Sequence, residues 1–362
     1  MKRMFLSLIF MVGAMTLASA QDAQQAAAEA AEAISAAPEV VPEVVKPNYW
    51  TNSLKTNVNL GQTSLNNWAA GGDNTVSFAG FVDGNANYAK DEMFWNNRLQ
   101  LDYGFLYASS KPILQKSTDR IYLESKWGYK TEAMKNVYFS ANYDFKSQFT
   151  TGYDYNTPGS LVDENGNQLE GDALKQAWKD ARGLKSGFLA PAYTNLALGI
   201  DYKPANWLSV NVAPLTGGYV IVQDEALRQG YSMPLKSEYE GVDEAELPTD
   251  GSQYKSSRFE LGAQLKADAA VSVNDNFKYS TQVVLFYNYL GTQKCPRINW
   301  DNRLDWKLAK YFSLTFTTNM IYDDTIMIVN AKDVTEFPDG KARVQFKQSL
   351  AFGFTYTIAS KK

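Results

Sequence analysis

The sequence predicts an all-β protein, a transmembrane antiparallel β-barrel of about twelve strands that follows a short N-terminal helical and linker segment. Three observations carry this prediction. Apolar and polar residues alternate over long stretches, the number of such stretches is even, and their connections alternate between short and long. Aromatic residues also make up 14% of the chain, as expected for a barrel with aromatic girdles at both membrane interfaces.

Residues 1–20 have the features of a secretory signal peptide. Lys2 and Arg3 precede an apolar run, and Ala18-Ser19-Ala20 supplies small residues at the cleavage position. The run is too short for a transmembrane helix. The mature chain is therefore expected to begin near Gln21, outside the cytoplasm.

Residues 21–48 differ in composition from the rest of the chain. "DAQQAAAEAAEAISAA" is rich in Ala and Glu, and "PEVVPEVVKP" repeats Pro. This composition predicts a weakly held helix followed by an extended linker, both on the periplasmic side. An alternative interpretation is a docking arm for a periplasmic partner or for the peptidoglycan layer.

Residues 49–362 repeat a period-two pattern. In "VQFKQSLAFGFTYTI", Phe346, Leu350 and Phe352 share one parity, and Lys347 and Ser349 take the other. Such alternation predicts strands with one apolar and one polar face. The expected strands span residues 52–62, 75–89, 94–108, 119–131, 136–150, 190–203, 206–215, 255–274, 276–290, 296–309, 311–323 and 342–358.

The expected connections alternate strictly in length. "KDEM", "EAMKN", "KPAN", "VNDN" and "LAKY" are tight turns, whereas the joins between them run from about ten to about forty residues. Outer-membrane barrels have short periplasmic turns and longer outer loops. The pattern therefore also predicts which end of the barrel faces the periplasm.

A secreted β-sandwich would show the same alternation, with the apolar parity buried instead of facing lipid. The expected strands favour the barrel because many have about fifteen residues, where globular strands usually have five or six. Their polar parity is rich in charge, which suits a water-filled lumen. Aromatic residues of the apolar parity also gather near the short turns, as an interfacial girdle requires. They are Tyr88, Trp95, Trp127, Phe139, Tyr202, Phe277, Trp306, Phe312 and Tyr356.

Charged side chains of the polar parity are expected to line the lumen. "WNNRLQLDY" (95–103) and "WDNRLDWKL" (300–308) both alternate inward charges with outward apolar residues. These charges either orient a polar solute or form salt bridges that stiffen the wall. Inward cations exceed inward anions only slightly, so no strong ion selectivity follows. The expected lumen-lining residues are Arg98, Asp102, Arg120, Glu124, Lys126, Asp144, Lys146, Arg258, Glu260, Asp301, Arg303, Asp305 and Lys307.

"GQTSLNNWAAGGDN", residues 61–74, is expected to form the first outer loop, in which Gly71-Gly72 permits the chain reversal. At this point the sequence resembles a Gram-negative envelope family of unknown function whose members are expected to be outer-membrane barrels. The residues that match its N-terminal signature are Gln62, Ser64, Asn67, Trp68, Gly71, Gly72 and Asn74.

A second stretch, "APLTGGYVIVQDEALRQGY", is similar to the Pro-Leu-Ser/Thr-Gly element of that family, although the expected second Gly near Tyr231 is missing. The resemblance spans most of the mature chain. It implies an outer-membrane location in a Gram-negative bacterium and a barrel fold, but no activity.

Two long outer loops have features of their own. In the first, "GDALKQAWKDARG" predicts a short amphipathic helix with Asp172 as N-cap and Trp178 on its apolar face. Before it, Asn165-Gly166 predicts a hairpin turn, and the acids around it suggest a calcium loop as an alternative. The second loop, residues 223–254, is acidic, which is typical of a solvated surface and also suits divalent cations near lipopolysaccharide.

The chain contains no His, which removes most nucleophilic hydrolase mechanisms and the commonest zinc and copper ligands. The single Cys295 cannot form an internal disulfide. The small net charge of −4 and the dispersed cations argue against a nucleic-acid partner. We therefore expect no enzymatic activity, no cofactor and no metal, and we consider a lipid-modifying enzyme only as a remote alternative.

The expected function is a narrow or gated channel for small polar solutes, with Trp68 and Trp178 constricting the outer mouth. The alternative is a non-conducting structural or assembly component of the outer membrane. Expected partners are outer-membrane lipid and lipopolysaccharide, the barrel-assembly machinery during insertion, and a periplasmic partner of the N-terminal arm.

Overall fold

The structure of the chain is a computed structural model that describes residues 48–63, 74–132, 134–328, 335–338 and 340–359. The expected signal peptide and all but the last residue of the expected N-terminal arm lie outside these ranges. Residues Tyr49–Lys362 cluster as one compact unit.

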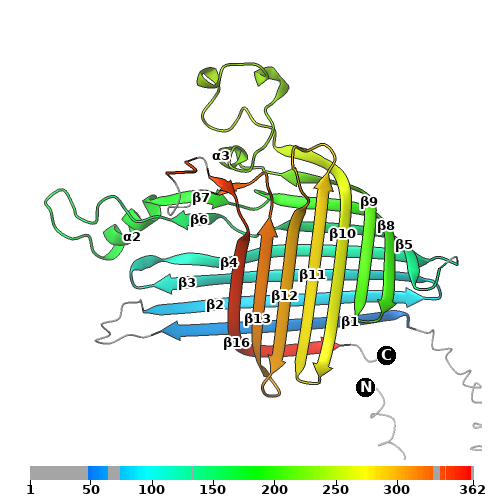
Figure 1. Ribbon diagram of the computed structural model, residues 1–362. Helices are drawn as coiled ribbons and strands as arrows, with labels where there is room; N and C mark the ends of the chain where they lie inside the picture. Colours follow the sequence, from blue (N-terminus) through cyan, green and yellow to red (C-terminus); the bar gives the residue numbers. More distant parts are fainter. Residues whose placement is uncertain (1–47, 64–73, 133, 329–334, 339, 360–362) are drawn as a thin grey trace, which may run out of the picture. The chain divides into compact units, whose positions relative to one another are not determined.

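In the described part of the chain, twelve strands pair antiparallel into one closed barrel (Figure 1). Around the barrel their order is β1-β16-β13-β12-β11-β10-β9-β8-β5-β4-β3-β2. Their bounds are β1 (Trp50–Thr63), β2 (Thr75–Lys90), β3 (Met93–Ala108), β4 (Lys111–Lys130), β5 (Val137–Ser147), β8 (Ala192–Ala205), β9 (Leu208–Ile221), β10 (Ser257–Asn274), β11 (Phe277–Asn288), β12 (Arg297–Lys307), β13 (Phe312–Tyr322) and β16 (Gln345–Ala359). The predicted fold class and strand number are confirmed.

The connection between β3 and β4 corrects one prediction. Residues 109–118 were expected to form a long outer loop, but β4 begins at Lys111 and only Ser109 and Ser110 remain in the turn. The first residues of β4 stay paired with β3 through two register shifts, which let the strand continue although its alternation is irregular. Connection lengths therefore do not alternate strictly.

β9 is longer than predicted, because a bulge hides its continuation in the sequence. Pro214 and Leu215 together oppose one residue of β10, Ala263. Val212 before the bulge and Tyr219 after it are both exposed on the outer face, although their parities differ. A bulge adds one residue and so exchanges the two faces of a strand. The Pro-Leu-Thr-Gly element recognised in the sequence is this bulge.

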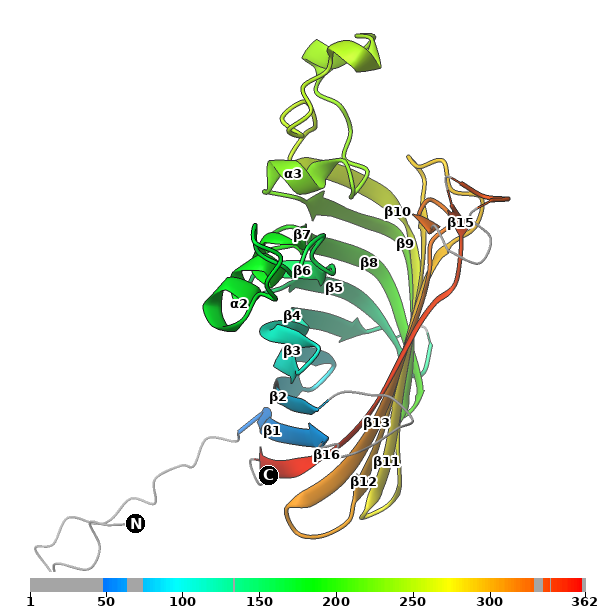
Figure 2. The same cartoon turned by 90° about the vertical axis from the view of Figure 1, so that its left-hand side faces the viewer.

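The outer surface of the barrel is apolar, as the parity assignment requires. On β16, Phe352 is 55% exposed while Gly353 is buried. Most of the predicted girdle is exposed outward near the short turns: Trp95, Trp127, Phe139, Tyr202, Trp306, Phe312 and Tyr356. Figure 2 shows that β1–β5 and β10–β13 form opposite walls. The barrel thus presents apolar side chains outward and polar ones inward.

Smaller elements fold from the long loops. The loop between β5 and β8 contains β6 (Gly152–Tyr155), α2 (Gly171–Asp180) and β7 (Arg182–Ser186). The loop between β9 and β10 contains α3 (Glu225–Arg228), η1 (Ser237–Tyr239) and η2 (Glu244–Glu246), and the loop after β13 contains β14 (Met327–Ile328) and β15 (Lys341–Ala342). Within the described ranges, no helix has the length and hydrophobicity needed to cross a bilayer.

Candidate functional site

The candidate site is a cavity of about 1060 Å³ inside the barrel, lined by residues from both walls. The charged side chains that line it come from β3, β4, β5, β8, β10, β12 and β16, and many amide and hydroxyl groups lie among them. Eight of the thirteen predicted lumen-lining residues lie on this cavity: Arg98, Asp102, Arg120, Glu124, Lys126, Lys146, Asp301 and Arg303.

The other five predicted residues do not line the cavity. Asp144 accepts a hydrogen bond from Asn195. Arg258 pairs with Glu260 at 3.1 Å, and Asp305 pairs with Arg303 at 2.9 Å. Lys307 is exposed at the end of β12, next to a short turn. These five residues therefore belong to the walls or the rim and not to the open space.

Most charges on the cavity are paired, some with a residue of another strand and some within their own strand. Arg98 on β3 pairs with Asp83 on β2 at 2.6 Å, and Arg120 on β4 pairs with Asp102 on β3 at 2.7 Å. The ladder on β3 thus balances its charges sideways with neighbouring strands, whereas on β12 Arg303 pairs with Asp305 of the same strand. Asp83 was not among the predicted residues, although the inward parity of β2 is the signal that could have identified it.

A cluster of nearly buried polar side chains fills part of the barrel and borders the cavity through Glu124 and Lys126. We call Glu124, Lys126, Asp201, Asn211 and Lys266 the polar core. The Lys266 ammonium on β10 lies 2.8 Å from the Glu124 carboxylate on β4, and Lys126 lies 2.7 Å from Asp201.

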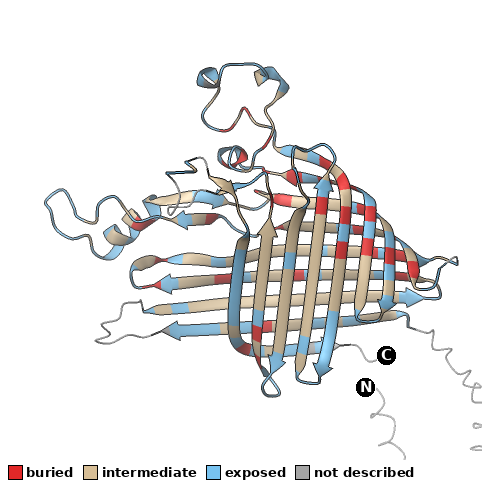
Figure 3. Cartoon of the chain, in the orientation of Figure 1, coloured by how far each residue is buried: buried red, intermediate tan, exposed pale blue. Residues whose placement is uncertain are grey.

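The ion pair between β10 and β4 crosses the interior, because β9, β8 and β5 lie between these strands in the wall. Asn211 adds a hydrogen bond to Ser140. Figure 3 shows that buried positions concentrate on β5, β8, β9 and β10. This side of the barrel is therefore filled with polar groups, among them the ion pairs of Lys126 and Lys266.

The loop between β9 and β10 folds onto this filled side at the end of the barrel opposite the short turns. Leu227 and Met233 pack with Val220 and Val222 of the barrel end in a small apolar cluster. Arg228 anchors the loop by donating hydrogen bonds to the backbone carbonyls of residues 222, 223 and 254. Burial raises the pKa of Tyr231 in this loop to about 12.

The predicted helix in the other long loop is confirmed as α2. Glu170, and not Asp172, occupies the N-cap position, and Asp172 lies in the first turn. Trp178 is buried, and the Lys111 ammonium lies 5.8 Å from its ring centroid, so Trp178 fastens α2 to the start of β4. Trp68, the second predicted constriction residue, lies outside the described residues.

Of the family signature, only Gln62 and Asn74 lie within the described ranges. Gln62 is an exposed residue of β1, paired with Val76 of β2. Ser64, Asn67, Trp68, Gly71 and Gly72 are outside the described residues. Gln62 near the end of β1 and Asn74 just before β2 thus flank the connection between these two strands.

The acidic segment 163–167 is a hairpin turn. Asp163 accepts hydrogen bonds from the backbone N–H groups of Asn165 and Asn167, and Gly166 has a φ of +81°. These hydrogen bonds, with those of Asn167 first, lower the pKa of Asp163. The carboxylate is thus occupied within its own turn, and the described residues contain no cluster of three potential metal ligands.

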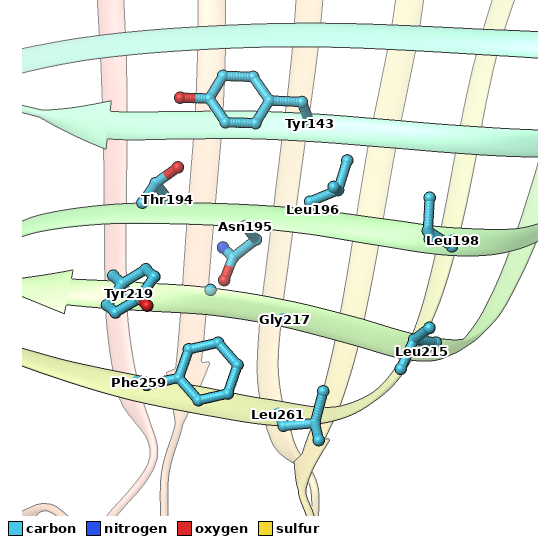
Figure 4. A pocket seen from close by; sticks show the side chains of 11 residues that line it. Tyr143, Thr194, Asn195, Leu196, Leu198, Leu215, Gly217, Tyr219, Phe259 and Leu261 are labelled. Atoms are coloured by element: carbon cyan, nitrogen blue, oxygen red, sulfur yellow. The ribbon is translucent and has the colours of Figure 1, made fainter.

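A second hollow lies on the outer surface and is apolar (Figure 4). It has a volume of about 370 Å³ and forms where Gly217 leaves a gap among Leu196, Tyr219 and Phe259. These side chains are exposed on the barrel exterior. The groove therefore belongs to the apolar outer surface and has no access to the charged interior.

Comparisons with known proteins find one family model and several solved structures that are similar to this chain. Residues 60–153 match the family described as "Protein of unknown function (DUF3078)". No curated protein matches the chain.

Similar solved structures include the COG4313 outer membrane channel from Pseudomonas putida F1, with 11% identity, coverage of 89% of this chain and 100% of that one, and a TM-score of 0.33. The translocator domain of the autotransporter NalP from Neisseria meningitidis has 9% identity, coverage of 93% and 95%, and a TM-score of 0.35. A porin has 9% identity, coverage of 85% and 100%, and a TM-score of 0.28. Similarity at this level carries no argument about function.

Proposed function

We propose that this protein is an outer-membrane channel for small polar solutes in a Gram-negative bacterium. The observation that supports this function best is the cavity of about 1060 Å³ with its lining of paired charges, amides and hydroxyls. It lies inside a closed barrel whose outer surface is apolar. An apolar exterior suits lipid, and a polar interior of this size suits water and solutes.

Two features support the outer-membrane location: the apolar exterior of a barrel with a polar interior, and the expected signal peptide. Phe346, Leu350, Phe352 and Ile358 on β16 are each more than half exposed, an arrangement that would be unfavourable in water. We propose outer-membrane lipid and lipopolysaccharide as the surroundings of this surface. We also propose that the barrel-assembly machinery binds the protein during insertion and that the N-terminal arm binds a periplasmic partner.

The test of the channel function is the single-channel conductance of the purified protein in planar lipid bilayers. Open-channel steps above the protein-free baseline support the proposal. Deleting residues 171–184 tests whether α2 constricts the mouth, and deleting residues 224–254 tests the loop that folds onto the filled side. If the pore is gated by a loop, at least one deletion increases the conductance.

A non-conducting structural role is the second candidate, and the polar core favours it. Lys266 and Lys126 are almost fully buried in ion pairs that close part of the interior. If neither deletion variant nor the intact protein conducts, while all fold and insert, the channel proposal is rejected. The barrel would then act as a scaffold for its loops and N-terminal arm.

A further inference from the structure

Two opposite charges face each other across the cavity without forming an ion pair. Lys146 lies on β5 and Asp301 on β12, and both line the cavity. Four strands, β8, β9, β10 and β11, separate them in the wall, so they stand on nearly opposite sides of the interior. Asp301 is close enough to act electrostatically on the Lys146 ammonium, yet no contact within 4.0 Å joins them.

The lack of a partner distinguishes these residues from most charges around them. Thirteen charged side chains line the cavity, and nine of them form ion pairs. Among the described residues, the four without one are Lys146, Lys347, Asp268 and Asp301. Asp301 accepts a hydrogen bond from Asn319, and Asp268 accepts one from Gln282. In both cases the hydrogen-bond donor is a neutral amide, and Asp268 also acts electrostatically on Lys266 of the same strand.

The surroundings of each charge favour a different end of a solute. Arg120 adds a second positive charge close to Lys146 on the same wall, since it lies diagonally across the β4–β5 pair. On the opposite wall, Asp301 and Asp268 flank the Gln282 amide. Two cations line the same wall: Arg303, which pairs with Asp305, and Lys347, which lies two strands from Asp301. The space next to Lys146 and Arg120 therefore suits a carboxylate, and the space next to Asp301 and Asp268 suits an ammonium group.

We propose that the cavity selects zwitterionic solutes, namely free amino acids or short peptides. This inference rests on the proposed channel function. The carboxylate of the solute binds Lys146 and its ammonium group binds Asp301. In an α-amino acid the two groups are attached to one carbon atom, and in a short peptide they lie further apart, so a solute that lies between the Lys146 and Asp301 side chains can contact both. A simple anion would meet repulsion from Asp301 and Asp268, and a simple cation would meet repulsion from Lys146 and Arg120.

The test compares glycine with glycolamide, an uncharged isomer of the same mass, in uptake by liposomes that contain the purified barrel. For the intact protein, we expect glycine to enter faster than glycolamide. Lys146→Gln and Asp301→Asn should each lower the ratio of the two rates about tenfold, since each removes one charge-assisted hydrogen bond. Heat-dependent migration on SDS gels verifies that each variant is folded.

Two further variants separate the specific effect from a general loss of charge. The exchange Lys146→Asp with Asp301→Lys keeps both charges on opposite walls and should restore most of the preference, because the solute can bind in the reverse orientation. Lys347→Gln removes an unpaired cavity lysine from the wall that carries Asp301 and should change the ratio less than about twofold.

The outcomes distinguish this inference from the channel function. If ions and both isomers pass without a preference for glycine, the inference is wrong and the channel stands. If nothing passes, the channel function fails, and saturation-transfer NMR with glycine decides the inference in the detergent-folded barrel. A signal that Lys146→Gln weakens supports the zwitterion site, and the absence of a signal overturns it.

Discussion

The polar core and the cavity occupy the same interior, but they hold their charges in different surroundings. In the polar core, Lys266 is only 3% exposed and its partner Glu124 is 14% exposed. On the cavity, Arg98 is 40% exposed although it pairs with Asp83 at 2.6 Å. Short ion pairs are therefore present in both regions, and only the access of water differs.

This difference shows how one barrel can combine rigidity with an open space. A buried ion pair fixes two strands firmly, because separating the partners leaves a charge in a medium that solvates it poorly. A water-exposed pair contributes little and can rearrange. The filled side thus stabilises the barrel, and the exposed charges remain available to a solute.

The largest effect is expected from breaking the ion pair across the polar core. Lys266→Ala leaves the Glu124 carboxylate without its cation and should reduce the free energy of unfolding by about 3–5 kcal/mol. Urea titration in lipid vesicles, followed by tryptophan fluorescence, measures the change. Lys347→Ala, on the cavity, serves as the control and should have an effect below about 0.5 kcal/mol.

The double variant Lys266→Met with Glu124→Leu sharpens this prediction. Replacing a buried ion pair with apolar residues of similar volume is often neutral or stabilising. We expect the double variant to recover most of the lost stability. A double variant as unstable as Lys266→Ala would show that the two residues stabilise the core separately.

The next effect concerns the outer surface. Phe352→Arg places a charge on the apolar face of β16 and should reduce stability in lipid by about 2–4 kcal/mol. Thr317→Arg, on the neighbouring strand, enters the cavity instead and should be tolerated. The same urea titration compares them, and the reverse order would show that the two faces are inverted.

A smaller effect is expected for the exposed pair on the cavity. Arg98→Gln removes the ion pair with Asp83 and should reduce stability by less than about 1 kcal/mol. The loss should shrink further as salt is added, because exposed charges are screened. An effect as large as that of Lys266→Ala would contradict the proposed difference in water access.

The smallest effect concerns the exposed turn at Asp163, far from both interior regions. Its hydrogen bonds with Asn167 lower the pKa of Asp163 in the folded protein. The turn is therefore stabilised above the ordinary Asp pKa, and this contribution is lost as the pH falls through the lower folded value. Carboxyl NMR titration measures the pKa, and Asn167→Ala should raise it toward the ordinary value. A calcium-dependent shift would revive the calcium-loop interpretation.

The sequence by itself determined the strands, their number and which face of most of them is apolar. Period-two alternation is a local property, so Phe352 and Lys347 could be assigned to opposite faces without knowledge of the fold. Local composition likewise predicted α2 and the turn at Asn165-Gly166. Prediction of the strand bounds from local patterns was wrong at the bulge of Pro214 and Leu215 and at the start of β4. At both places pairing with the neighbouring strand continues although the alternation is irregular.

Only the tertiary structure decided which charges meet. Lys266 and Glu124 are far apart in the sequence, and closure of the barrel brings them within 2.8 Å. The same closure leaves Lys146 and Asp301 unpaired. The position of a residue in the alternation indicates that its side chain points inward. The distance across the interior depends on the diameter of the barrel and on the tilt and register of all twelve strands. That distance separates a filled polar core from an open cavity.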